Sequence, residues 1–128
     1  MSAAAQLSIN DATPTAHLFD PVAVSPSLAL FRNTTDASTS ATEEQIGASL
    51  SRANANRATN KAKISVSVPY EQTIDGAVVT RSVARANIEF VLPDDMSSSE
   101  RSHFGALVRN TFANSSIADY YEDLVPVW

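Results

Sequence analysis

Residues 60–93 read NKAKISVSVPYEQTIDGAVVTRSVARANIEFVLP and contain two runs of alternating apolar and polar side chains. In the first run, 61–68, isoleucine and valines alternate with lysines and serines, and the same two-residue period returns in 79–92. Side chains that alternate in this way point to opposite faces of a β-strand. The Asp75-Gly76 dipeptide between the runs suits the positive φ angles of a tight hairpin turn. We therefore expect two antiparallel neighbouring strands, each with one apolar face.

Shorter strand signals precede this pair. Pro21 and Pro26 are expected to interrupt any strand that would run on from Thr15–Phe19 to Leu28–Asn33. The Ser/Thr-rich residues 34–42 have the composition of a loop. The first two signals flank Asp11-Ala-Thr-Pro14 and form a candidate N-terminal hairpin. The expected strands are Gln6–Asn10, Thr15–Phe19, Leu28–Asn33 and Gln45–Asn54.

After Pro93 the apolar period changes from 2 to 3.6, which is typical of helices. Ser97 and Glu100 have capping-box spacing, so a helix should begin near Ser98. Asn114 breaks this helix and can cap a second one, which ends before Pro126. The two apolar stripes consist of Phe104, Leu107, Val108 and Phe112 in the first helix, and of Ile117, Tyr120, Tyr121 and Leu124 in the second.

This order of elements predicts an α+β fold in a single domain, residues 1–128. Residues 1–27 form the N-terminal hairpin region, 28–93 an antiparallel sheet of about five strands, and 97–125 two helices that pack on one sheet face. Aromatic residues make up only 7% of the chain, so we expect much of the burial to lie between subunits. The predicted obligate dimer would bury Phe104, Leu107, Val108, Phe112, Ile117 and Tyr121.

The charge is unevenly distributed along the chain. The net charge is −5, yet residues 52–85 hold six basic residues against two acidic ones. With both helices on one sheet face, no sequence remains to cover the other face, where like charges on neighbouring strands would repel each other. A bound polyanion would relieve that repulsion. The residues expected to face outward together are Lys61, Lys63, Ser65, Ser67, Arg81, Arg85 and Asn87.

Signals for catalysis and metal binding are weak. The chain has no cysteine, which excludes disulfides, cysteine-ligated metals and thiol nucleophiles. His17 and His103 have no nearby carboxylate at triad or metal spacing, and we interpret both as surface or boundary residues. Asp94-Asp95 is better explained by the dipole of the helix that follows than by a cation site. We therefore expect no catalytic residue, metal, cofactor or small-molecule substrate.

The N-terminal Met-Ser-Ala-Ala-Ala lacks the basic and apolar regions of a signal peptide, and no apolar run approaches the ~20 residues that span a bilayer. These features predict a cytosolic protein without a membrane partner.

Three segments read ASLSR at 48–52, NKAKISVSVP at 60–69 and RSVARANIEFVLP at 81–93. Together they resemble the coat proteins of single-stranded RNA bacteriophages. With the capped helix after Pro93, the likeness covers about Leu28 to the C-terminus. The most specific part is the strand Arg-Ser-x-x-x-x-Asn-x-Glu that ends in proline.

The resemblance implies a homodimer whose sheets join edge to edge, with each subunit's helices on its partner, and an icosahedral shell assembled from dimers in the bacterial cytoplasm. The bare sheet face would line the virion interior and bind genomic single-stranded RNA, including a hairpin whose capture represses replicase translation. Arg85 stands where well-studied members place a stacking aromatic, so stacking does not carry over, whereas backbone neutralisation by lysine and arginine does. Asp75 and Gly76 match the loop at the shell's symmetry axes. The RNA-facing residues carried over are Ser49, Ser51, Lys61, Lys63, Ser65, Arg85 and Asn87, and charge adds Arg81.

Two alternatives remain open from the sequence. A small nucleic-acid-binding regulatory dimer that never assembles would explain the basic strands equally well. A shell protein without RNA affinity is the other.

Overall fold

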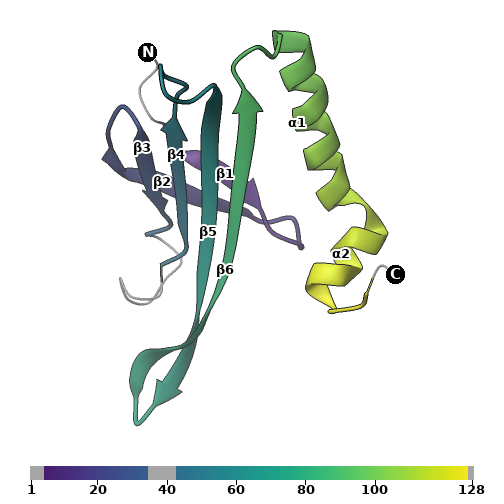
Figure 1. Ribbon diagram of the computed structural model, residues 1–128. Coiled ribbons are helices and arrows are strands. Elements are labelled where there is room, and N and C mark those ends of the chain that lie inside the picture. The colour runs from purple at the N-terminus through teal and green to yellow at the C-terminus, as the bar shows by residue number, and fades with distance from the viewer. Residues whose placement is uncertain (1–4, 35–42, 127–128) are drawn as a thin grey trace. The chain divides into compact units, whose positions relative to one another are not determined.

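The computed structural model describes residues 5–34 and 43–126, and the chain forms two compact units, residues 1–91 and 92–128. The first unit is a six-stranded sheet in which every strand lies beside its neighbours in sequence (Figure 1), one strand more than the five or so expected. Its strands are β1 (Leu7–Asn10), β2 (Ala16–Val24), β3 (Leu28–Arg32), β4 (Gln45–Ser51), β5 (Thr59–Ile74) and β6 (Ala77–Pro93). The Ser/Thr-rich loop expected at 34–42 lies outside the described residues except for Thr34.

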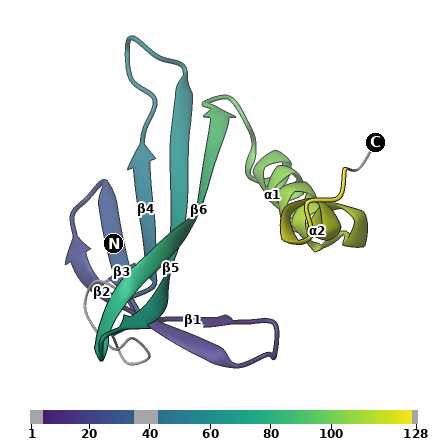
Figure 2. The same ribbon diagram turned by 90° about the horizontal axis from the view of Figure 1, so that it is seen from below.

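Strand β2 is divided between two partners. Its first half pairs with β1 up to Phe19, and its second half pairs with β3 from Asp20 onward. The outer part of the β1–β2 hairpin consequently runs across the direction of β4–β6 (Figure 2). The expected break at Pro21 is wrong, because the strand continues through a register shift between Pro21 and Ala23. Such an irregularity accommodates a proline, which has no backbone N–H for the ladder.

The alternating runs form the predicted antiparallel strands, but both strands are longer than the runs. β5 and β6 extend past 61–68 and 79–92 to a turn in which Asp75 and Gly76 have φ angles of 51° and 80°. Two consecutive positive φ angles match the tight hairpin turn predicted from the dipeptide. The extension is explained by strand pairing, which does not require alternating hydrophobicity once the turn sets the register.

The described part of the sheet unit has a small core. Phe19 and Phe31 are buried, and Asn33 is 1% exposed. Phe31 pairs with Pro21, two residues after Phe19, so both rings lie on the same sheet face. Large apolar side chains such as Leu28 and Ile64 remain exposed. Taken by itself, this unit therefore leaves much apolar surface exposed.

The second unit contains α1 (Ser98–Ala113) and α2 (Ser115–Glu122). Ser97 and Glu100 form the predicted capping box, and the Asn114 side chain accepts hydrogen bonds from the first backbone N–H groups of α2. The capping hydrogen bonds from Ser97 lower the pKa of Glu100. The two predicted helices and the residues that separate them are thus confirmed.

Contacts between the helices involve two of their aromatic residues. The Tyr121 hydroxyl donates to the Phe112 carbonyl at 3.1 Å, and their rings meet edge to face at 6.4 Å between centroids. Leu124 does not extend the α2 stripe as expected, since it follows the helix with φ 57° and is 83% exposed. The Val125 N–H donates back to the Asp119 carbonyl, which closes the helix end before Pro126 is reached. Among the described residues, no helix is long and apolar enough to cross a membrane.

Candidate nucleic-acid interface

The β4–β5 ladder separates polar from apolar side chains. Ser49 pairs with Lys63 and Ser51 with Lys61, whereas Ala48 pairs with Ile64. Directly paired residues project from the same side of a sheet. We call the side that carries Ser49, Ser51, Lys61, Lys63 and Ser65 the polar face, and the side that carries Ile46, Ala48, Leu50, Ala62, Ile64 and Val66 the apolar face.

Strand β6 contributes to the polar face as well. The Lys63 Nζ atom lies 3.4 Å from the Glu89 Oε2 atom, which places Glu89 beside the β4–β5 lysines. Asn87 and Arg85 line a hollow together with Ser65. Side chains at every second position of β6 therefore continue the polar face onto the last strand of the sheet.

Three adjoining hollows indent the polar face, with volumes of about 390, 470 and 520 Å³. The first includes Asn87 and Glu89, the second Arg85, and the third Arg57 and Lys61. The first and third share Lys63. The hollows thus form a continuous strip that crosses four strands, from β3 to β6.

Arg57 belongs to this strip although strand periodicity does not predict it. It lies in the connection between β4 and β5, where its guanidinium donates to the Ser51 hydroxyl at 2.6 Å and to the Arg52 carbonyl at 2.9 Å. The Arg57 Nε–H group donates a third hydrogen bond, to the Thr59 carbonyl. The fixed guanidinium lines the third hollow with both lysines. In the sequence, only the excess of basic residues in 52–85 indicates that Arg57 contributes to this strip.

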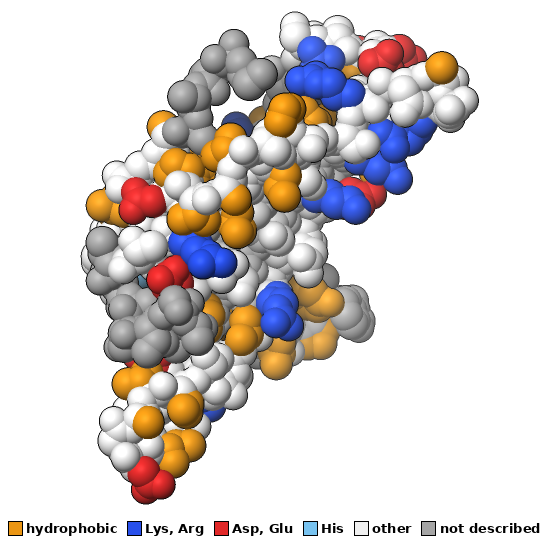
Figure 3. Space-filling model, turned by 90° about the vertical axis from the view of Figure 1, so that its left-hand side faces the viewer, with side chains coloured by type: hydrophobic (Ala, Val, Ile, Leu, Met, Phe, Trp, Pro, Cys, Tyr) orange, Lys and Arg blue, Asp and Glu red, His pale blue; other side chains and the backbone are white. Residues whose placement is uncertain are grey.

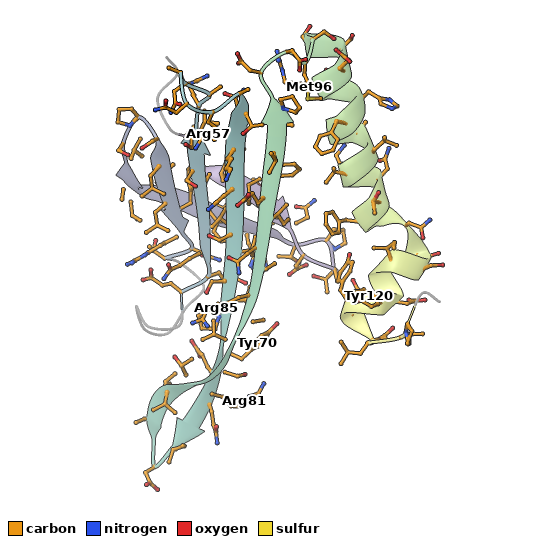
Figure 4. The ribbon with its side chains drawn as sticks, viewed as in Figure 1. Arg57, Tyr70, Arg81, Arg85, Met96 and Tyr120 are labelled. Carbon is orange, nitrogen blue, oxygen red and sulfur yellow. The ribbon has the colours of Figure 1, made fainter. Side chains whose placement is uncertain are left out.

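Seven of the eight residues predicted to face RNA line these hollows, namely Ser49, Ser51, Lys61, Lys63, Ser65, Arg85 and Asn87. Arg81 does not line any of the three. It lies nearer the turn of the β5–β6 hairpin than Arg85, whereas Arg57 is at the opposite end of β5 (Figure 4). The cations therefore extend along the sheet instead of forming one cluster.

Two residues of the strip, Leu28 and Gly47, have no polar side chain, which the charge pattern does not predict. Leu28 pairs with Ser49, so an exposed leucine lies on the polar face. Gly47 pairs with Ser65 and contributes no side chain. Leu28 and Gly47 therefore add no polar group to the strip.

The residues predicted for dimer and shell contacts remain accessible in the subunit. Phe104, Leu107, Phe112 and Tyr121 on the helices are exposed, and Val108 and Ile117 are half-buried. Asp75 and Gly76 form the exposed turn of the β5–β6 hairpin. Figure 3 shows hydrophobic side chains spread over the surface of one side of the molecule, with lysine and arginine among them.

The expectation that His17 has no nearby carboxylate is wrong. Its Nδ1 atom lies 2.6 Å from Glu44 Oε1, and its Nε2 atom lies 2.8 Å from Asp11 Oδ2. The hydrogen bond to Glu44, which has the larger effect, and the one to Asp11 raise the pKa of His17 to about 9. Glu44 is 27 residues from His17 in sequence, so spacing along the chain does not predict this pair. In the described part of the chain, no group of three or more acidic and histidine residues is arranged to hold a metal.

A family model described as levivirus coat protein matches residues 2–128, which is nearly the whole chain. No curated protein sequence matches the chain significantly.

Solved structures share its fold at low sequence identity. A virus-like particle of Beihai levi-like virus 21 has 19% identity and a TM-score of 0.90, with 99% of each chain covered. A virus-like particle of bacteriophage ESE058 has 20% identity and a TM-score of 0.82, covering 100% of this chain and 99% of the other. The capsid protein of bacteriophage GA has 17% identity and a TM-score of 0.77, covering 94% of this chain and 95% of the other.

Proposed function

This chain belongs to the levivirus coat protein family, and we propose that it pairs as a dimer, builds an icosahedral shell and holds single-stranded RNA against its polar face. The chain is a bacteriophage capsid protein that assembles with copies of itself, and its place is the virion. The family is one of structural proteins and not of enzymes. Assembly in the host cytoplasm is part of the proposal.

The observation that carries RNA binding is the pairing of Ser49 with Lys63 and of Ser51 with Lys61 across β4 and β5. It sets two ammonium groups and two hydroxyls side by side on a face of the sheet. Arg57 and Arg85 add cations to the adjoining hollows. Such a surface neutralises phosphates and donates hydrogen bonds to their oxygens.

Base recognition is assigned to Asn87, which lines the first and second hollows. Its carboxamide can both donate and accept, as a base edge requires. Single-stranded loops expose such edges to proteins. We include in the proposal the capture of an RNA hairpin that represses replicase translation, with Asn87 as the residue that discriminates between hairpins.

Dimerisation is supported by apolar side chains that are exposed on each of the two units. Ile64 on the apolar face and Leu107 on α1 are 38% and 54% exposed. β6 is the last strand in the sheet order, and among the described residues no further strand continues the edge of its 17 residues. A second copy would complete that edge by pairing with its own β6, and its helices would cover apolar surface.

Expression of the chain alone, electron microscopy and extraction of nucleic acid from purified material test the proposal. Closed particles that contain host RNA are expected. Folded dimers that bind RNA without forming particles would favour the non-assembling regulatory dimer. Particles free of nucleic acid would indicate a shell protein without RNA affinity and would refute the role given to the polar face.

A further inference from the structure

His17 lies between two carboxylates, and each of its ring nitrogens faces one of them. The contacts are 2.6 Å from Nδ1 to Glu44 and 2.8 Å from Nε2 to Asp11. A neutral imidazole has one N–H, so it can donate to only one of these acceptors. The other nitrogen would then present its lone pair to a carboxylate oxygen. Only the imidazolium, with two N–H donors, satisfies both contacts.

Both carboxylates are held by partners of their own. The Asp11 Oδ1 atom accepts from the backbone N–H groups of Thr13 and Thr15, at 2.8 and 2.9 Å. Glu44 accepts from the Asn33 side chain at 3.1 Å, and its carbonyl accepts from the Asn33 N–H at 3.0 Å. Since Asn33 is 1% exposed, Glu44 is anchored to the most deeply buried polar residue of the described chain.

The position of His17 on β2 decides which parts of the sheet these contacts connect. The β2–β3 ladder begins at Asp20, so the part of β2 that carries His17 has β1 as its ladder partner. The bond from His17 to Glu44 therefore joins the outer half of the β1–β2 hairpin to the residue that precedes β4. Phe19, which is 5% exposed, ends the half of β2 that pairs with β1 and belongs to the core.

We infer that His17 is a proton-operated lock that holds the outer half of the β1–β2 hairpin on the sheet and releases it on deprotonation. The inference does not depend on RNA binding. The charged groups that face the ring are Asp11 from the hairpin turn and Glu44 from the residue before β4. Asn33, at the end of β3, is neutral and contacts Glu44.

The lock opens on the alkaline side. The pKa of His17 is raised from 6.5 to about 9. Stabilisation from a raised histidine pKa is complete below the unfolded value and is lost as the pH rises through the folded value. Hydrogen bonds from Thr13, Thr15 and His17 hold the pKa of Asp11 well below its usual range, so this partner stays charged in mild acid. The hairpin is consequently locked at neutral pH and released above about pH 9.

The test combines a histidine titration with hydrogen exchange on the full chain. The protein has only two histidines, so ¹³C-labelled histidine gives two ring signals, which the His103→Gln variant assigns. The His17 signal should titrate near pH 9. Exchange in 7–10 and 16–19, corrected for the intrinsic rate, should rise by about tenfold for each pH unit between pH 6.5 and about 9 and should level off above that. Exchange in 61–68 of β5 is the internal control.

Variants separate the lock from a general loss of stability. Glu44→Gln leaves an oxygen for Asn33 but removes one charge beside the ring, so release should occur at lower pH. His17→Gln should show the released exchange pattern already at pH 7, whereas His103→Gln should match the parent. A His17 signal that titrates at or below 6.5, or hairpin exchange that does not follow the titration, would overturn the inference. Both readouts come from the unmodified chain, so they decide it even if a variant fails to fold.

Discussion

Gly47 and Ser65 face each other across β4 and β5 so closely that a β-carbon on Gly47 would lie 2.8 Å from the Ser65 hydroxyl oxygen. This is below any normal van der Waals distance, so a side chain at Gly47 requires the serine to move. The pair lies on the polar face, in the first hollow. The Ser65 hydroxyl thus occupies the space that a side chain at residue 47 would need.

The stability effect of Gly47→Ala is predicted to depend on Ser65. Alanine should gain about 0.5–1 kcal/mol over glycine within a strand, but the displaced hydroxyl offsets part of this gain. In a Ser65→Ala background the full gain should appear. Urea unfolding of the parent, both single variants and the double variant measures the coupling. Additive effects would mean that the two side chains do not compete for space.

Replacement of Lys61 and Lys63 by alanine should weaken binding of all RNAs about equally. Each phosphate contact on a single strand contributes about 0.7 to the slope of log affinity against log salt, so the slope should fall by up to about 1.4. Filter binding over a salt series measures it. The matched control is Arg101→Ala with Arg109→Ala, which removes two positive charges from α1. An unchanged slope in the lysine variant would mean that the polar face is merely solvated.

Glu89→Gln should raise RNA affinity. The Glu89 carboxylate lies 3.4 Å from the Lys63 ammonium, and both side chains are well exposed, at 43% and 60%. Exposed pairs contribute about 0.2–1 kcal/mol, so releasing Lys63 should tighten binding by up to about fivefold. The salt slope should become steeper in the same titration. Glu122→Gln removes an equal charge from α2, in the other unit, and should leave both quantities unchanged.

Phe112→Ala should disrupt the dimer. The Phe112 ring is 45% exposed in the subunit, and a partner that buries it would make its loss cost about 3–5 kcal/mol. Analytical ultracentrifugation of a dilution series measures the dissociation. Tyr121→Phe is the control, because it removes only the hydroxyl that bonds to the Phe112 carbonyl. A parent protein that dilutes to a stable folded monomer would contradict the obligate dimer.

Deletion of residues 73–78, with an Asn-Gly turn in their place, should leave dimers folded but prevent shell closure. These residues form the exposed end of the β5–β6 hairpin, around Asp75 and Gly76. Removal of an equal number from each strand keeps the facing of the side chains. Ultracentrifugation reports the dimer and electron microscopy the shells. Normal particles from this variant would show that the hairpin end takes no part in assembly.

Features that depend on neighbours in sequence were predictable. The capping box of Ser97 and Glu100, the cap at Asn114 and the turn at Asp75-Gly76 each use hydrogen bonds or φ angles within a few residues. The two-residue period assigned Lys61 and Lys63 to one face and Ile64 to the other, because alternation is a property of the extended chain itself.

The sequence by itself therefore determined where strands and helices occur, the helix caps and the side of β5 on which each residue lies, since these follow from local geometry and period, but it did not determine how far each strand extends. Only the tertiary structure decided which distant groups meet. It brought Glu44 to His17, placed Leu28 opposite Ser49 and carried β2 through Pro21. Each of these depends on the register between strands and on the path of a connection. Register is set by the match between the patterns of two strands and by the geometry of their connection, which the period of a single strand does not reveal.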